Sequence, residues 1–332
     1  MRPLPSLLGA AVLLALSAAP PAAADDSSPS SFQIKDPRIA ESSGLAASRA
    51  HPGVYWTHND SSDGPYVYAV DSRTGKTVAR IAMRGVGKPR DVEAVSVGPD
   101  GNVYVGDIGD NLGGQWSHVW IYRFPEPKKL RDMTVKATQF TVEYQGGPRN
   151  AEAMMVHPKT GKVYIASKSE EDGGLYEGPD TLTPSGTNVF RRIAPVDMEV
   201  TDGAFAPDGS RLVLRGYFTA AEYRWRNGKP KELKEEPGLP LQRQGESVTF
   251  STDGGTLMYG TEGQYSRVSA EPLDGELLPD ATAKEQKKNG GKGGSHAGRG
   301  EDDKNGTLTK AVLTFGGAMV LFLGVRRLFR RR

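Results

Sequence analysis

The stretch Glu93-Ala-Val-Ser-Val-Gly-Pro-Asp-Gly-Asn-Val-Tyr-Val-Gly-Asp107 is the clearest copy of a phrase that occurs five times in this sequence. An acidic residue opens a short apolar run, a Pro-Asp-Gly turn follows, and a second apolar run ends at another acidic residue. Two short runs joined by such a turn are typical of a β-hairpin. A hairpin that recurs along the chain in this way indicates a solenoid or a propeller.

The other four copies share the order of polar or acidic residue, strand, glycine-containing turn and strand. They run from Ser43 to Asp60, Glu152 to Lys168, Asp202 to Arg215 and Glu246 to Glu262. A third strand-like run follows every hairpin, for example Val119–Phe124, and a more polar fourth run follows in several copies, for example Thr138–Tyr144. The sequence therefore predicts an all-β chain that forms a single β-propeller of four-stranded blades, five in number. The alternative is a β-sandwich with coincidental Asp-Gly turns, which would not explain a phrase that recurs with its acidic residue.

Two further features of the propeller depend on segments outside the five repeats: a sixth blade and the closure of the ring. A sixth, degenerate blade would have to lie between residues 107 and 150 or between the fourth and fifth copies. The segment Phe32–Ile39 precedes the first copy. We expect this segment to complete the last blade and so to close the ring.

The two ends of the chain carry targeting signals. Residues 1–24 combine an early arginine, an apolar core and an Ala-Ala-Ala cleavage site, which is the pattern of a signal peptide. Residues 307–325 are mostly apolar, at the short limit for a transmembrane helix, and residues 326–332 form a basic tail that belongs on the cytoplasmic side. We therefore expect a single-pass protein of the cell membrane, with its N-terminal domain outside and its C-terminal tail in the cytoplasm.

Composition sets the remaining boundaries. We expect residues 25–31 to be disordered, 32–280 to form the propeller and 281–306 to be a flexible stalk, because that last segment is rich in Lys and Gly and nearly free of apolar residues. The 332 residues include no cysteine, so the domain contains no disulfide. The net charge is only +2 and the basic residues cluster in the tail, which argues against a nucleic-acid partner. The expected state is a monomeric domain outside the membrane.

Hairpin geometry predicts where a functional site would lie. The first strand of a hairpin starts on the side where the second ends, and closing the ring gathers these positions at one mouth of the central channel. Glu93, Glu152 and Glu246 each precede the turn by six residues. Asp202 precedes its turn by five, so Thr201 takes the equivalent position and a bulge or a looser fit is needed there. The predicted channel-mouth residues are Ser43, Asn59, Asp60, Glu93, Asp107, Asp110, Asn111, Glu152, Lys168, Asp202, Arg215, Glu246 and Glu262.

The carboxylates expected at this mouth can serve three purposes. Carboxylates in a narrow space repel one another, and a hard cation such as Ca²⁺ would relieve this repulsion. The predicted metal ligands are Glu93, Asp107, Asp110 and Glu152. Basic neighbours, with Arg90, Lys168 and Arg215 as candidates, would neutralise the acids without a metal. A structural role is the third interpretation, in which each acid bonds backbone amides of the next blade and joins the blades together.

The repeat also carries a resemblance to a known group of proteins. Its Pro-Asp-Gly turn followed by Val-Tyr-Val resembles the repeat of bacterial exported propellers of the YVTN and WD40-like kind. The stretch from Arg90 to Val95, together with Tyr104-Val-Gly-Asp-Ile-Gly-Asp-Asn111, is similar to a signature of the phytase/esterase-like group of such propellers. The resemblance covers about residues 32–280 and implies metal-assisted hydrolysis of phosphoesters or esters as one activity. The calcium ligands and phosphate-binding basic residues of a complete phytase site have no counterpart in this sequence.

We therefore predict an exported, membrane-anchored propeller that binds a ligand or protein partner at an acidic channel mouth, with Ca²⁺ as the candidate cofactor. One alternative is a metal-dependent hydrolase in which a metal-bound water attacks an ester. The other is a surface interaction scaffold without a small-molecule site. No HExxH, GxSxG or P-loop motif selects a catalytic residue.

Overall fold

The computed structural model describes residues 29–61 and 63–290, in which nearly all regular structure is β-strand. Five antiparallel units follow the five sequence repeats. The first unit contains β2 (Ser42–Ala47), β3 (Val54–Asn59), β4 (Tyr66–Asp71) and β5 (Lys76–Arg84). The second contains β6 (Val92–Val97), β7 (Asn102–Asp107), β8 (Val119–Pro125) and β10 (Thr138–Tyr144).

The remaining three units repeat this plan. The third contains β11 (Ala151–Val156), β12 (Val163–Ser169), β13 (Gly174–Glu177) and β14 (Thr187–Pro195). The fourth contains β15 (Met198–Phe205), β16 (Arg211–Gly216), β17 (Ala220–Arg226) and β18 (Lys229–Glu232). The fifth contains β19 (Gly245–Phe250), β20 (Thr256–Thr261), β21 (Arg267–Pro272) and β1 (Phe32–Gln33).

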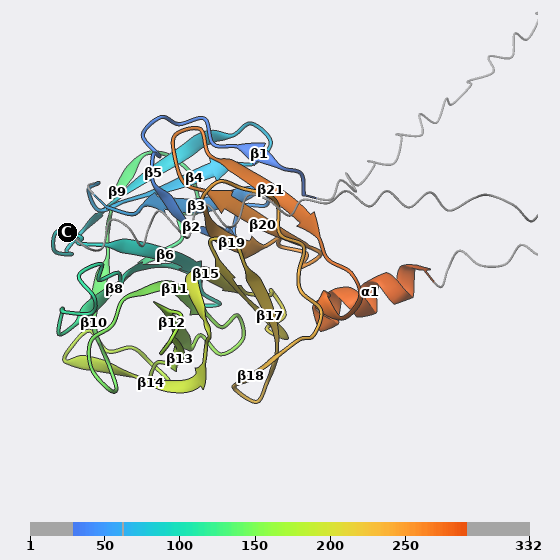
Figure 1. Cartoon of the computed structure of the whole chain (residues 1–332). Coiled ribbons are helices and arrows are strands. Elements are labelled where there is room, and N and C mark those ends of the chain that lie inside the picture. The colour runs from blue at the N-terminus through green and yellow to red at the C-terminus, as the bar shows by residue number, and fades with distance from the viewer. Residues whose placement is uncertain (1–28, 62, 291–332) are drawn as a thin grey trace, which may run out of the picture. The chain divides into compact units, whose positions relative to one another are not determined.

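The five units are arranged around a common centre. Their first strands, β2, β6, β11, β15 and β19, lie in the middle in Figure 1; each contacts the next, and β19 contacts β2. An apolar cluster fills each of the five spaces between neighbouring units. Hydrogen bonds join the strands of the described residues into three sheets, none of which closes on itself. Side-chain packing between units therefore completes the ring, and this arrangement is that of a β-propeller.

The first strand of the chain completes the last unit, as the sequence predicted. β1 pairs antiparallel with β21, with Phe32 opposite Val268. The Phe32 ring packs against Tyr55 of the first unit with 5.5 Å between ring centroids. Pairing begins at Phe32, and just before it Ser31 Oγ, in the segment 25–31 expected to be disordered, accepts a hydrogen bond from Ala270 N at 2.9 Å.

Glycine fixes the geometry of the five hairpin turns. The turn glycines all have φ between 69° and 77°; they are Gly53, Gly101, Gly161, Gly209 and Gly254. Residues with a side chain pay a steric penalty in this left-handed region. The recurring glycine of the sequence phrase is therefore required by the backbone of the turn.

The long segment between the second and third repeats holds an extra strand and no extra blade. β9 (Met133–Lys136) pairs parallel with β5 at the outer edge of the first unit. No sixth four-stranded unit occurs within residues 29–61 and 63–290. The described domain thus has five blades.

The folded region continues past residue 280, where the sequence had placed the start of a flexible stalk. A short 3₁₀ helix, η1 (Gly275–Leu277), leads into α1 (Asp280–Gly290). Arg211 Nη1 donates a hydrogen bond to Asp280 Oδ1 at 2.9 Å, and Ala283 packs against the cluster between the fourth and fifth units. Within the part of the chain that the structure describes, no helix has the length and apolarity to cross a membrane. The predicted signal peptide (1–24), transmembrane helix (307–325) and basic tail (326–332) lie outside the described residues.

Candidate functional site

A polar cavity of about 100 Å³ lies at the end of the channel where the first strands begin. All five units contribute to its wall. The lining residues are Ser43, Asp60, Glu93, Asn111, Glu152, Lys168, Tyr217, Gln244, Glu246 and Glu262. Four units supply a residue from the start of the first strand, whereas the fourth supplies only Tyr217, which directly follows β16. This is the gathering that hairpin geometry predicts, although not with every residue expected.

β-Bulges near the start of the first strands place the acids at this cavity. In the pairing of β6 with β7, Val92 lies opposite Asp107 and Ala94 lies opposite Gly106, so Glu93 has no partner residue. Glu152 in β11 and Glu246 in β19 lack a partner residue in the same way. A bulge turns one extra side chain out of the alternating pattern of a strand. Here it directs a carboxylate into the channel mouth.

Three carboxylates form the closest acidic group. Asp60, Asp91 and Glu93 each offer one oxygen, and these three oxygens lie within 4.8 Å of one another. Glu93 is only 3% exposed and uses Oε2 to accept a hydrogen bond from Ser43 Oγ at 3.0 Å. Oδ1 of Asp60 is buried without a hydrogen-bond partner in the described residues. Among those residues no Lys, Arg or His forms an ion pair with any of the three carboxylates.

The electrostatics of the cluster show that its negative charge is poorly compensated. Burial, reinforced by neighbouring Asp91, raises the pKa of Asp60 to about 8. Burial and the Glu152, Asp60 and Asp91 carboxylates raise the pKa of Glu93 well above its usual range. Burial also raises the pKa of Asp91 and of Glu246. The folded protein therefore favours protonation or a bound cation at this position.

Among the described residues, Lys168 is the one basic side chain that lines the cavity, and it forms an ion pair with one acid only. Its Nζ lies 2.6 Å from Glu152 Oε1 and donates a hydrogen bond to Tyr217 Oη at 2.6 Å. Burial lowers the pKa of Lys168, but the Glu152 carboxylate outweighs burial and the pKa rises. Despite this partner, burial keeps the pKa of Glu152 at about 7. Lys168 therefore neutralises Glu152 and leaves the group of three carboxylates without a basic partner.

The last residue of β7 and the loop that follows it hold the backbone around the acidic group in place. Asp107 is fully buried; its Oδ1 accepts a hydrogen bond from Asp91 N at 2.9 Å, and its carboxylate also accepts from Arg90 N and Tyr122 Oη. Asn111 lines the cavity and donates to Asp91 Oδ2 at 3.1 Å. The Asp107 carboxylate holds the chain around Asp91 in place and does not reach the cavity.

Asp110 is also a structural residue of this loop. Its Oδ2 accepts a hydrogen bond from Trp116 N at 2.6 Å, and its own amide donates to Asn150 Oδ1 at 2.7 Å. The structure does not bring the four predicted ligands Glu93, Asp107, Asp110 and Glu152 together as one close group in the described residues. Asp107 and Asp110 stabilise the loop, Glu152 pairs with Lys168, and only Glu93 belongs to the group of three carboxylates.

Asp202 and Arg215 were expected at the mouth and are instead buried between blades. The bulge of β15 falls on Thr201, so Asp202 points away from the cavity and accepts hydrogen bonds from Gly203 N at 2.7 Å and Val248 N at 2.9 Å. Complete burial raises the pKa of Asp202, against the opposing effect of these amides. Arg215, which is fully buried, donates to the carbonyl oxygens of Ser247 at 2.7 Å and Gly260 at 2.9 Å.

Asn59 also has a structural role. Its Oδ1 accepts hydrogen bonds from the amides of Ala40 and Glu41, at 2.9 and 3.0 Å. Its Nδ2 donates to Arg38 O and to Asp63 Oδ2, both at 2.8 Å. Asn59 thus fixes the turn that presents the neighbouring Asp60 to the cavity.

Three residues of the site were not among the predicted ones. Asp91 lies two positions before the acid of the repeat phrase, and Tyr217 and Gln244 lie in connections outside the strands. The stretch from Arg90 to Val95 resembles a propeller signature, and this resemblance is the one sequence signal that points to Asp91. No repeated position marks Tyr217 or Gln244.

Comparisons with known proteins add only coarse information. No protein-family model matches the chain, and no curated protein matches it. Similar solved structures include a chain of the mitotic checkpoint complex, with 12% identity, a TM-score of 0.39 and coverage of 70% of this chain and 61% of that one. A proposed 6-phosphogluconolactonase from Bacteroides uniformis has 12% identity, a TM-score of 0.41 and coverage of 71% and 68%. Kuenenia stuttgartiensis hydrazine synthase has 13% identity, a TM-score of 0.39 and coverage of 66% and 61%.

This chain spans 61–68% of the length of those three structures. A propeller fold serves many unrelated functions, so the side chains of the site must carry any functional assignment.

Proposed function

We propose that this propeller binds a divalent cation, with Ca²⁺ as the best match, at the acidic channel mouth, and that the cation forms part of a binding site for a ligand or protein partner. The observation that carries the proposal is the group of Asp60, Asp91 and Glu93, whose oxygens lie within 4.8 Å of one another without an ion-pair partner in the described chain. The buried, unpartnered Oδ1 of Asp60 and the almost fully buried Glu93 support it. Buried carboxylates without compensation are costly, and a bound cation removes this cost.

The donor set favours Ca²⁺ over other ions. Ca²⁺ takes six to eight oxygen ligands at about 2.3–2.6 Å, so two oxygens on one ion can be separated by up to about twice that distance. The three carboxylate oxygens lie within 4.8 Å of one another, close enough to bind one such ion together. Three carboxylates leave room for water or ligand oxygens on the ion. Mg²⁺ demands shorter distances and a stricter octahedron, and Zn²⁺ prefers nitrogen and sulfur ligands.

The hydrolase alternative has less support from the residues. Hydrolysis by a metal-bound water needs a ligand set that holds the ion and a separate group that takes up the proton. Asp107 and Asp110 hold the supporting loop, and Glu152 is engaged by Lys168 at 2.6 Å. We therefore keep the proposal to binding.

We also propose that the site faces the outside of the cell. The support is the pattern of residues 1–24 and 307–332, which combines a signal peptide with an apolar segment and a basic tail. Cation sites of extracellular modules often have dissociation constants of about 10⁻⁴–10⁻³ M, because Ca²⁺ is abundant there. A site with only three carboxylates fits that range.

Calcium is expected to stabilise the purified protein against heat. At a concentration ten to a hundred times its dissociation constant, the ion should add roughly 1.5–2.7 kcal/mol to the free energy of unfolding, a shift of several degrees in melting temperature. Thermal unfolding is to be followed after removal of metal with a chelator, then with Ca²⁺, Mg²⁺ or Na⁺ at matched ionic strength. Equal curves with and without Ca²⁺, together with no heat of binding in calorimetric titration, would remove the cation from the proposal.

Replacing Gly109 by alanine is expected to damage the cation site. A Cβ on this residue would lie 2.5 Å from Asp91 Oδ2 and 2.8 Å from Glu93 Oε1, so the two carboxylates would have to move. We expect at least about a tenfold loss of Ca²⁺ affinity, comparable to the loss when residues behind a metal ligand are changed. Calorimetric titration checks this, with Gly87→Ala as the matched control, since a Cβ there meets only an atom 4.0 Å away. Unchanged affinity in Gly109→Ala would show that the ion binds elsewhere.

A further inference from the structure

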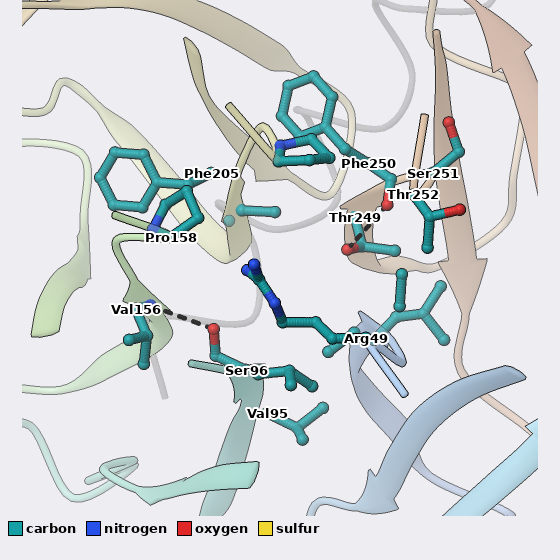
Figure 2. Close-up of a pocket in the computed structure, with 17 residues that line it drawn as sticks. Arg49, Val95, Ser96, Val156, Pro158, Phe205, Thr249, Phe250, Ser251 and Thr252 are labelled. Atoms are coloured by element: carbon teal, nitrogen blue, oxygen red, sulfur yellow. Dashed lines mark hydrogen bonds between the residues drawn. The ribbon is translucent and has the colours of Figure 1, made fainter. Parts of the chain in front are cut away.

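A second cavity, of about 230 Å³, lies at the opposite end of the channel, where the first strands end (Figure 2). In β6, Glu93 lines the acidic mouth, whereas Ser96 and Val97 line this second cavity. Residues three to four apart in a strand are separated by roughly 10–13 Å. The two cavities therefore belong to different ends of one ring, and a ligand in the second cavity does not require a cation in the first.

The chemistry of the second cavity is opposite to that of the mouth. Among the described residues no carboxylate lines it, and Arg49 is the one charged residue in its wall. Apolar walls come from Val156, Pro158, Phe205 and Phe250, as Figure 2 shows. Ser96, Thr249, Ser251 and Thr252 add hydroxyl groups to the same wall, so apolar and polar surface line the cavity in similar amounts. Apolar walls with convergent polar groups are the usual form of a small-molecule site.

Arg49 is placed to bind an anion. It lies just after β2, and its guanidinium extends between the side that carries Pro158 and Phe205 and the side that carries Thr249 (Figure 2). No hydrogen bond joins it to another lining residue in Figure 2, and it takes part in no ion pair among the described residues. A guanidinium presents a fork of N–H donors that matches the two oxygens of a carboxylate.

Ser96 supplies a second donor. Its Oγ accepts a hydrogen bond from Val156 N at 3.1 Å, so the position of the hydroxyl is fixed while its proton can still be donated. A carboxylate bound by Arg49 can therefore also accept a hydrogen bond from the Ser96 hydroxyl in the same cavity. An attached apolar group would rest against Pro158 and Phe205.

We propose that this cavity binds a small organic carboxylate with a short apolar body. The volume of about 230 Å³ lies below the range of roughly 300–1,000 Å³ that holds drug-sized ligands, so the body must be short. The positive charge of Arg49 and the absence of any lining acid select the anion. The apolar part of the wall offers an organic body contacts that inorganic phosphate cannot make.

The test compares an acid with its neutral analogue on the purified full-length protein. Calorimetric titration with 3-phenylpropionate should show saturable binding, and 3-phenylpropanamide should bind at least about tenfold more weakly, as expected for loss of a charge-assisted hydrogen bond. Arg49→Gln should weaken binding of the acid to the level of the amide and leave binding of the amide unchanged. Arg84→Gln, on an exposed position of β5 outside this cavity, is the control and should bind the acid as the natural protein does.

The proposal fails if acid and amide bind equally, if Arg49→Gln leaves binding of the acid intact, or if neither compound binds at millimolar concentration. The comparison of acid and amide on the natural protein does not depend on any variant. Arg49 is exposed and makes none of the hydrogen bonds drawn in Figure 2, so Arg49→Gln should keep the melting temperature of the natural protein. A titration with inorganic phosphate completes the set, and phosphate binding as tight as that of the acid would show a general anion site and overturn the choice of a carboxylate.

Discussion

Replacement of Asp202 by alanine is expected to lower the free energy of unfolding by about 3–5 kcal/mol. The carboxylate is fully buried; it accepts a hydrogen bond from Gly203 N of its own strand at 2.7 Å and joins the fourth blade to the fifth by accepting another from Val248 N at 2.9 Å. The backbone amide of Leu45, on the first strand of the ring, also acts to lower the pKa of this carboxylate. Alanine would leave these buried donors without acceptors and would remove a favourable charge near Arg215. An unsatisfied buried polar group costs about 1–3 kcal/mol, so several together explain the size of the effect.

Chemical denaturation measures this loss, and the change is to be compared with that of an exposed acid. Asp172→Ala is the matched control, because the Asp172 side chain is 75% exposed and pairs only with the part-exposed Arg192. Its replacement should change the free energy of unfolding by no more than about 0.5 kcal/mol. A loss below about 1 kcal/mol for Asp202→Ala would mean that water or another side chain satisfies the amides of Gly203 and Val248, and that Asp202 does not join the blades.

Local patterns explain why the sequence predicted so much of the fold. Each hairpin is specified by residues close in sequence: an apolar run, a turn whose glycine adopts a positive φ, and a second run. The prediction that Phe32–Ile39 would complete the ring came from its place before the first repeat, and β1 does pair with β21. α1 was not predicted, because its contacts, such as that of Asp280 with Arg211, come from residues far away in the sequence.

The candidate site was less predictable, because small shifts in register decide it. Asp202 is one position closer to its turn than Glu93 is. This shift by one residue places the Asp202 side chain between blades, whereas Glu93 points into the channel. Arg215 is the next-to-last residue of its second strand, as Lys168 is of its own. The guanidinium of Arg215 nevertheless reaches into the neighbouring blade and donates a hydrogen bond to the carbonyl of Ser247. The sequence shows the position of such residues but not the direction of their side chains, which depends on a bulge and on the partner strand.

Replacement of Glu93 by glutamine is expected to have two opposite effects, which together separate a cation site from a structural one. Glutamine keeps the size of the side chain and can still accept the hydrogen bond from Ser43 Oγ. It removes one negative charge from the group with Asp60 and Asp91. Without Ca²⁺ at pH 8 we therefore expect a higher melting temperature than that of the natural protein. Affinity for Ca²⁺ should fall by roughly 100-fold, since even residues behind a metal ligand cost ten- to a hundredfold.

The pH dependence of stability gives the same prediction a second readout. An acid whose pKa is higher in the folded than in the unfolded protein binds an extra proton when folded, so its contribution to stability is present at low pH and is lost as pH rises through the folded pKa. The pKa of Asp60 is about 8 and that of Glu152 about 7, against about 4 in an unfolded chain. The metal-free protein should therefore lose stability between about pH 4 and pH 8.

Calcium should oppose this loss, because the ion competes with protons for the same oxygens. Its stabilising effect should be small at pH 5 and largest near pH 8. In Glu93→Gln the metal-free loss with pH should be shallower and the calcium effect nearly absent, whereas Glu262→Gln, at the rim of the same cavity, should keep most of both. If the acids only join the blades, the result reverses: Glu93→Gln lowers the melting temperature at every pH, and calcium changes neither protein.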